Sequence, residues 1–200
     1  MILTYGESEK GLVRKVNEDA INLSVNNLYL LADGMGGYDG GQIASSLAVQ
    51  SAGRFLGSVP AFSEQLLKES FYAANRAILN EKKDNPELRS MGTTMVAAAE
   101  AGDKLVWAHV GDSRLYRFQQ GKLEQITTDH SFVMELVNEG KLSRAEMRVH
   151  PRKNEITRAV GIEDELKVDT GSFALENGTF ILLCTDGVSG MVEDRDLESL

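Results

Sequence analysis

Apolar and polar positions alternate in several short stretches of this chain, and Gly or Asn separates most of these stretches. A period of two residues indicates β-strands, and Gly or Asn between them indicates tight turns. We expect strands at residues 2–5, 20–24, 28–32, 94–99, 105–110, 115–118, 123–126, 167–173 and 180–185. The short turns predict hairpins, including one that turns at Gly111-Asp112-Ser113 and a last one that turns at Glu176-Asn177-Gly178.

Two longer segments predict helices instead. Residues 63–82 carry an apolar stripe at helical spacing, and residues 43–56 follow a glycine-rich stretch at 34–41. Shorter helices are expected at 131–139 and 143–147, with another beginning at 194, whereas the polar segment 148–157 has no periodicity and indicates a mobile surface excursion. This order of elements predicts an α+β fold in which helices lie outside antiparallel sheets.

Composition narrows the class of protein. With 200 residues and 42% hydrophobic content, the chain is expected to form a single domain over residues 1–200. The net charge of −9 argues against nucleic acid or an anionic membrane as a partner, and no apolar run is long enough to span a bilayer. The single cysteine, Cys184, lies in an apolar run and indicates a small core residue. We therefore expect a cytoplasmic protein without membrane insertion.

Four aspartates lie at ends of the expected strands: Asp19, Asp33, Asp112 and Asp186. A single Asp after a strand is more often a turn residue than a ligand, so each position alone leaves both interpretations open. Together they indicate a site for hard cations, because carboxylates, carbonyls and water suit Mg²⁺ or Mn²⁺. The sequence has no Cys or His pairs at the spacing that zinc sites use.

Other residues near these aspartates are less specific. Arg14 is a candidate for gripping a phosphoryl group through its planar guanidinium, although a solvated surface arginine is the alternative. His109 lies within an expected strand and indicates a structural role, whereas His130 is either the start of a helix or a residue that supports the site. The glycine-rich stretch lacks the Lys-Ser/Thr of a phosphate-binding P-loop.

Motifs from the whole chain carry a family resemblance when they are taken in order. They are Gly11-Leu12-Val13-Arg14-Lys15-Val16-Asn17-Glu18-Asp19-Ala20, Ala32-Asp33-Gly34-Met35-Gly36-Gly37, Met91-Gly92-Thr93-Thr94, Val110-Gly111-Asp112-Ser113-Arg114, Thr128-Asp129-His130-Ser131 and Cys184-Thr185-Asp186-Gly187-Val188. This order resembles the metal-dependent Ser/Thr protein phosphatases of the 2C type, and most of all the bacterial members that oppose Hanks-type kinases. The resemblance implies a four-layer αββα sandwich with two central antiparallel sheets.

The resemblance also implies a centre for two Mn²⁺ or Mg²⁺ ions. Asp33 would bridge both ions, the Gly34 carbonyl would bind one, and Asp186 would bind the other. Asp19 and Glu18 would act directly or through water.

Further roles follow from the same resemblance. Asp112 and Asp186 would match a weaker third metal site, and Arg14 would bind the substrate phosphate. Residues 140–157 would form a flap beside the centre.

The implied reaction is hydrolysis of phosphoserine and phosphothreonine in proteins by a water that the metal ions activate. The partners would be phosphorylated proteins, including a Ser/Thr kinase and its substrates.

One departure from the family bears on activity. The family continues past the match to Glu193 through a helix to a strand that carries a further metal-binding Asp, whereas this sequence ends at Leu200. The C-terminal end of the domain is therefore expected to be missing. A catalytically impaired phosphoprotein-binding or regulatory module of the same fold is the alternative function, and a structural cation-binding domain is a third.

Overall fold

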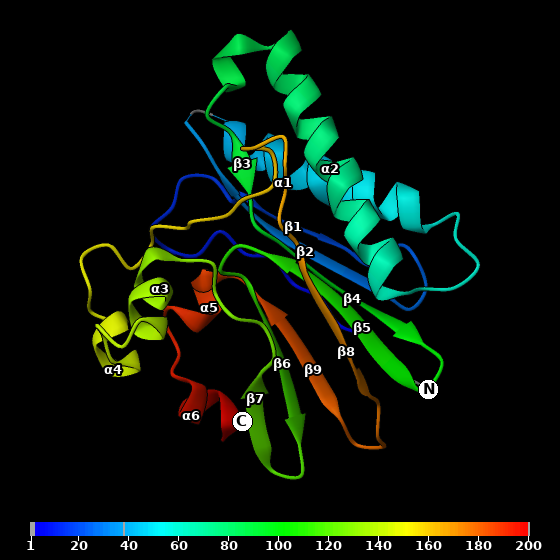
Figure 1. Ribbon diagram of the computed structural model, residues 1–200, viewed down its shortest axis with the longest axis vertical. Helices are drawn as coiled ribbons and strands as arrows, with labels where there is room; N and C mark the ends of the chain where they lie inside the picture. Colours follow the sequence, from blue (N-terminus) through cyan, green and yellow to red (C-terminus); the bar gives the residue numbers. More distant parts are fainter. Residues whose placement is uncertain (1–2, 38, 200) are drawn as a thin grey trace.

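Two antiparallel sheets form the centre of the computed structural model, which describes residues 3–37 and 39–199 (Figure 1). The first sheet has the strand order β1 (Asp19–Asn22), β2 (Leu28–Met35), β4 (Met95–Ala101), β5 (Lys104–Val110) and β8 (Asp169–Ala174), and β3 (Gly92–Thr93) also pairs with β2. The second sheet has the order β7 (Lys122–Gln125), β6 (Arg114–Gln119) and β9 (Phe180–Cys184). Both sheets confirm the expected α+β class.

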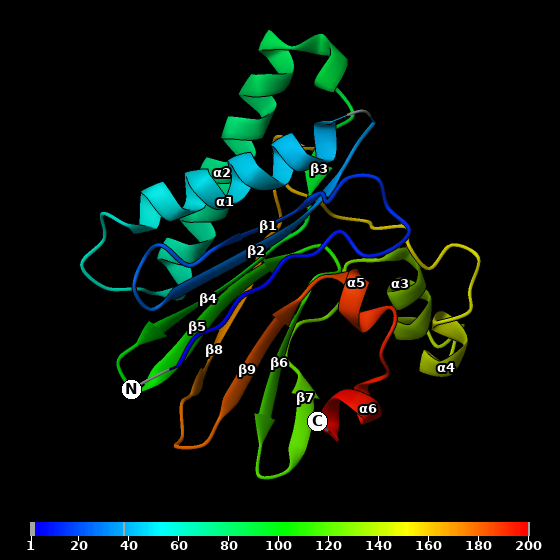
Figure 2. The same ribbon diagram turned by 180° about the vertical axis from the view of Figure 1, so that it is seen from behind.

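Helices flank the two sheets. The two long helices, α1 (Gly40–Leu56) and α2 (Glu64–Asp84), cover the outer face of the first sheet (Figure 2). The short helices α3 (Phe132–Asn138), α4 (Arg144–Met147), α5 (Asp186–Ser189) and α6 (Asp194–Glu198) lie beside the second sheet, and a 3-10 turn, η1 (Pro86–Leu88), follows α2. No helix within residues 3–37 and 39–199 combines the length and the apolar character that a bilayer crossing needs.

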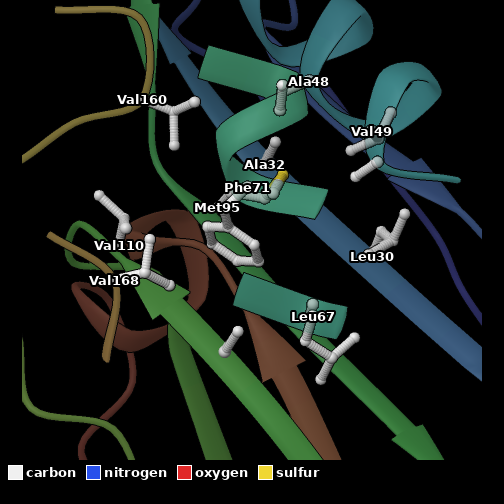
Figure 3. Packing of buried hydrophobic residues seen from close by; sticks show 14 of the residues in the cluster. Leu30, Ala32, Ala48, Val49, Leu67, Phe71, Met95, Val110, Val160 and Val168 are labelled. Atoms are coloured by element: carbon white, nitrogen blue, oxygen red, sulfur yellow. The ribbon is translucent and has the colours of Figure 1, made fainter. Parts of the chain in front are cut away.

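Strand β4 explains why the sheets stack as they do. Its residues alternate between two cores: Met95, Ala97 and Ala99 pack under the helices, whereas Val96 and Ala98 pack against the second sheet. Figure 3 shows the first of these cores, which includes Phe71 of α2 and Met95 of β4. A strand that is buried on both faces needs a layer on each side, so the sequence of β4 requires a sandwich.

Helix α2 confirms its expected position. The hydroxyl of Ser63 accepts a hydrogen bond from the backbone N–H of Leu66 at 3.2 Å and caps the helix. The expected apolar stripe is buried, with Leu67, Phe71 and Ile78 fully covered. Helix α1 begins at Gly40, three residues before the expected start at 43, because the small residues Gly40 and Gly41 allow its first turn to pack closely.

One expected strand is wrong. Residues 3–5 of the expected strand 2–5 belong to no strand, and position 2 lies outside the described residues. Leu3 and Tyr5 are 91% and 83% exposed, so neither of these apolar side chains contributes to a core. The alternating pattern was present, but the segment has no strand partner in the part of the chain that the structure describes.

Two expected hairpins are also wrong. Strand β5 pairs with β4 and β8, and β6 pairs with β7 and β9, so the segment Gly111-Asp112-Ser113 carries the chain from one sheet to the other. The segment between β8 and β9 makes the same kind of crossing. Leu105 of β5 and Leu115 of β6 are buried in one apolar cluster between the two sheets, and the burial of this apolar surface favours the crossing.

Candidate metal centre

Asp19 and Asp33 lie directly opposite each other in the first sheet. Asp19 begins β1, and its register partner in β2 is Asp33. Side chains of directly opposed residues point to the same face of a sheet with Cβ atoms about 4.5–5.5 Å apart. Asp33 was expected at the end of its strand, but it lies inside β2. The reason is that β3 pairs with Gly34 and Met35 and so extends β2 to Met35.

Two threonines after α2 fix the backbone of Asp33. The N–H of Asp33 donates to the Thr94 hydroxyl at 3.0 Å, and its carbonyl accepts from the Thr94 N–H at 2.9 Å and from the Thr93 hydroxyl at 2.8 Å. Both threonines are buried. Every hydrogen-bonding group of the Asp33 backbone is thus engaged, and this leaves only the carboxylate free to act.

The third aspartate is tied to the same network. The Thr94 hydroxyl lies 2.6 Å from the Ser113 hydroxyl, next to Asp112 in the segment that crosses between the sheets. Gly111 in this crossing has φ +111°, and a Cβ there would lie 2.5 Å from the Thr94 side chain. Only glycine combines this backbone conformation with so close an approach, so the crossing is adapted to place Asp112 beside Asp33.

Asp186 reaches the centre from the second sheet. It follows β9 and begins α5, and the preceding residue, Thr185, donates its hydroxyl hydrogen bond to Asp19 Oδ2 at 3.1 Å. This bond joins residues that are 166 positions apart in the chain. The negative charges of Asp19, Asp186 and Asp112 all act on Asp33, so the structure brings together the four aspartates that the sequence singled out.

The Glu18 and Gly34 positions depend on a close approach of α1 to β2. The Glu18 carbonyl accepts hydrogen bonds from the Gly34 N–H at 3.1 Å and from the Ser45 hydroxyl at 2.6 Å. A Cβ on Gly34 would overlap the Gly41 carbonyl, and a Cβ on Gly41 would overlap the Glu18 carboxylate. Glycine at both positions therefore lets the start of α1 lie against the carboxylates.

The electrostatics of the centre would favour a bound cation. Burial first, and then the charges of Asp19, Asp186 and Asp112, raise the pKa of Asp33 to about 8. Burial and Asp186 raise the pKa of Asp112 to about 7, and burial raises the pKa of Asp19 in spite of the hydrogen bond from Thr185. Carboxylates that repel one another in this way are stabilised when a cation lies between them.

The donor set fits Mg²⁺ or Mn²⁺. Among residues 3–37 and 39–199, no three His, Cys, Asp or Glu side chains form a group that could bind a metal ion by themselves. A site here would therefore complete its coordination with backbone oxygen, such as that of Gly34, and with water. Mg²⁺ commonly retains several waters and takes only one or two carboxylates from a protein.

Arg14 lies outside this network of carboxylates and hydrogen bonds. It is exposed, follows the turn at 11–13, and forms no ion pair or side-chain hydrogen bond with the other described residues. Its solvated position leaves the guanidinium accessible to a ligand, but nothing within the described residues orients it.

A pocket opens between the centre and the segment 140–157. Its volume is about 70 Å³, and the residues that line it include Asp112 and Asp186 as well as Arg148 and Lys153. Arg148 Nη1 also donates to the Ser189 carbonyl at the end of α5, at 3.3 Å. The basic side chains thus face the same space as two of the aspartates.

Sequence reasoning missed several residues that position the centre. Ser45 was not singled out by any pattern, since an isolated hydroxyl carries no periodic signal, and Thr185 was noticed only within a motif. Thr93 and Thr94 were noticed only as part of a motif. His130, whose alternatives were left open, caps no helix; instead its ring lies 3.0 Å from both the Gly111 nitrogen and an oxygen of Asp169.

Another buried network supports the second sheet. Arg114 forms a bidentate pair with Asp129, at 2.9 and 2.7 Å, and also donates to the Tyr116 hydroxyl, which in turn donates to Asp194 of α6. Burial raises the pKa of the Cys184 thiol to about 12, which agrees with a core residue and not a nucleophile.

Comparisons with known proteins agree with this geometry. Residues 13–200 match the family described as protein phosphatase 2C. The serine/threonine phosphatase stp of Listeria monocytogenes is 35% identical over 202 residues, which cover 96% of this chain and 80% of that protein. The crystal structure of the Mycobacterium tuberculosis serine/threonine phosphatase PstP/Ppp has a TM-score of 0.90 at 36% identity and covers 96% of this chain and 82% of that one.

A further solved structure bears on the metal. The catalytic domain of PstP in complex with two manganese ions has a TM-score of 0.87 at 35% identity, and the match covers 96% of this chain and 81% of that one. The family match spans most of the chain, and the fold and the order of the motifs agree with it. The chain therefore belongs to the protein phosphatase 2C family.

Proposed function

We propose that this protein hydrolyses phosphoserine and phosphothreonine in other proteins and requires Mn²⁺ or Mg²⁺ to do so. The observation that carries the proposal is the convergence of Asp19, Asp33, Asp112 and Asp186 on one site, to which distant parts of the chain contribute. The relatives' names favour this enzymatic function over a binding module without turnover.

Each residue of the centre would have its own role in binding the metal ions. Asp33 would bridge two ions, with Gly34 and Asp186 each binding one of them and with Glu18 and Asp19 acting directly or through water. Asp112 and Asp186 would supply a weaker third site. Two divalent cations in such a centre lower the pKa of a shared water and neutralise charge on the transferred phosphoryl group.

Substrate recognition would come from basic groups around the centre. Arg14 is exposed and would bind the phosphate through its guanidinium. Segment 140–157 would act as the flap, and Arg148 and Lys153, which line the pocket beside Asp112, would favour acidic phosphopeptides. The natural partners would be a Ser/Thr kinase and its substrates in the cytoplasm, and residues 1–200 would act as one domain.

The direct test is turnover of a phosphothreonine peptide and of p-nitrophenyl phosphate at millimolar Mn²⁺. We expect hydrolysis that EDTA abolishes and that Mn²⁺ restores. Arg14→Ala should raise KM more than it lowers kcat, because the guanidinium contacts the phosphate already in the bound substrate. Folded protein that binds the phosphopeptide through Arg14 without any turnover would instead establish the regulatory module.

Mn²⁺ affinity should increase with pH between about 6 and 8. In the metal-free protein the pKa values of Asp33 and Asp112 are about 8 and about 7, so both carboxyls carry protons at pH 6 and a cation must displace them. For each proton that the cation displaces, the Mn²⁺ affinity falls by up to about tenfold for each pH unit below the pKa of that carboxyl. Titration calorimetry in two buffers of different ionisation enthalpy measures the protons released. An affinity that is constant over this range, with no proton release, would contradict the assignment.

A further inference from the structure

His130 makes two contacts with one glycine. Its backbone N–H donates to the Gly111 carbonyl at 2.7 Å, and its ring Nδ1 accepts from the Gly111 N–H at 3.0 Å. The peptide groups on both sides of the Gly111 Cα are therefore bound to the same residue. The second of these peptide groups leads directly into Asp112, so its plane determines where the Asp112 side chain starts.

The hydrogen bonds determine which ring nitrogen carries the proton. A backbone N–H only donates, so Nδ1 of His130 must present its lone pair to Gly111. In the neutral ring the proton is then on Nε2, which lies 3.0 Å from Asp169 Oδ2 and donates to it. Burial lowers the pKa of His130, which agrees with a neutral imidazole.

Asp169 is itself oriented. Its other oxygen, Oδ1, accepts from Arg158 Nη1 at 3.0 Å, so the carboxylate connects the arginine and the imidazole. Arg158 Nη1 and His130 Nε2 are 3.2 Å apart, but both are donors in this tautomer and do not bond each other. The arrangement resembles the carboxylate–histidine pairs that orient metal ligands, except that this imidazole binds the backbone beside a ligand.

We propose that His130 is a positioning residue for Asp112: its imidazole, oriented by Asp169, holds the Gly111 N–H while its backbone N–H holds the Gly111 carbonyl, and together they fix the Asp112 carboxylate at the rim of the metal centre. Ser113 performs the corresponding task on the other side of Asp112 through its hydrogen bond with Thr94. This inference rests on the proposed function, because it takes Asp112 as a ligand of the weaker metal site.

The test compares two substitutions of His130. His130→Leu removes the acceptor, whereas His130→Asn retains an oxygen near the position of Nδ1. For His130→Leu we expect the dissociation constant of the weakest Mn²⁺ site to rise by about 10–100-fold, with the asparagine variant recovering most of the loss. Titration of the full chain with Mn²⁺, followed by electron paramagnetic resonance, measures the affinity. Amide hydrogen exchange of Gly111 and Asp112 should be faster in His130→Leu than in His130→Asn.

Two controls show whether His130 acts through Asp112. In the Asp112→Asn background, His130→Leu should cause no further loss of Mn²⁺ affinity, because the group that it positions is already gone. Ser63→Ala removes a similar side-chain acceptor, which binds the Leu66 N–H at 3.2 Å at the start of α2, and should leave the Mn²⁺ titration unchanged. If His130→Leu does not fold, His130→Gln, which reaches toward Asp169 but lacks the Nδ1 acceptor, replaces it in the comparison with His130→Asn.

The inference is overturned if the variants without the acceptor retain wild-type Mn²⁺ affinity and exchange rates, or if the losses add fully to those of Asp112→Asn. Failure of the proposed function is recognised separately, as absent turnover of phosphopeptide by the wild-type protein. In either case, the amide exchange rate of Gly111 in the metal-free protein shows whether the His130 imidazole holds this backbone N–H.

Discussion

Asp33→Asn should lower the turnover of a phosphothreonine peptide by at least about 10³-fold at saturating Mn²⁺. Loss of the carboxylate that would bridge two ions removes several kcal/mol of transition-state stabilisation, and each 1.36 kcal/mol corresponds to tenfold in rate. Steady-state kinetics on purified protein measures this loss. An asparagine variant with more than a few per cent of wild-type activity would contradict the role of Asp33 as a bridging ligand.

The same substitution should stabilise the metal-free protein. The backbone of Asp33 is bound by Thr93 and Thr94, and the asparagine side chain has nearly the same shape, so the fold has no reason to change. At pH 8 the substitution removes a half-buried carboxylate that is repelled by the charges of Asp19, Asp112 and Asp186. We expect the free energy of unfolding of the metal-free protein to rise by about 0.5–2 kcal/mol. Stabilising substitutions that reduce activity commonly have effects of this size.

Urea unfolding with and without Mn²⁺ measures both effects. The wild-type protein should gain stability from Mn²⁺, whereas Asp33→Asn should gain little. Asp103→Asn is the matched control, because Asp103 lies exposed in the turn between β4 and β5 and should alter neither activity nor stability. A variant that is both inactive and unstable would show that Asp33 serves the fold and would leave its catalytic role without support.

Gly34→Ala should destabilise the protein by about 3 kcal/mol or more, at the upper end for an overpacked site. The added methyl group would overlap the carbonyl of Gly41 and lie 2.8 Å from the carbonyl oxygen of Glu18. These are backbone atoms, which cannot rotate away as a side chain would. Relief of the overlap would have to move α1 away from β2.

Gly37→Ala is the control for this prediction. A Cβ on Gly37 meets no atom within 4 Å, although the residue belongs to the same glycine-rich stretch. Denaturant unfolding should therefore show a change of less than about 0.5 kcal/mol for this variant. Equal stabilities of the two alanine variants would refute the close approach of α1 to β2.

Some features of this protein follow from local sequence alone. The stripe of Leu67, Phe71 and Ile78 with Ser63 before it determines α2, because helical spacing and a capping hydroxyl act within one segment. Strands β1, β2 and β4 to β9 were recognisable for the same reason, with ends that shift by a few residues, whereas the two-residue strand β3 was not predicted. The four aspartates were also visible, since each lies in or next to an apolar run that could only be a strand.

Only the tertiary structure decided how these pieces combine. The segment around Asp112 looks like a hairpin turn, but the packing of β5 against β6 makes it a crossing between sheets, and the crossing is what places Asp112 beside Asp33. The hydrogen bonds from Thr185 to Asp19 and from Gly111 to His130 join residues that no local pattern connects. Burial and neighbouring charge, which raise the pKa values of Asp33 and Asp112, arise only when distant segments exclude water from one place. The sequence by itself thus determined which residues supply the chemistry, and the tertiary structure decided that they act on one site.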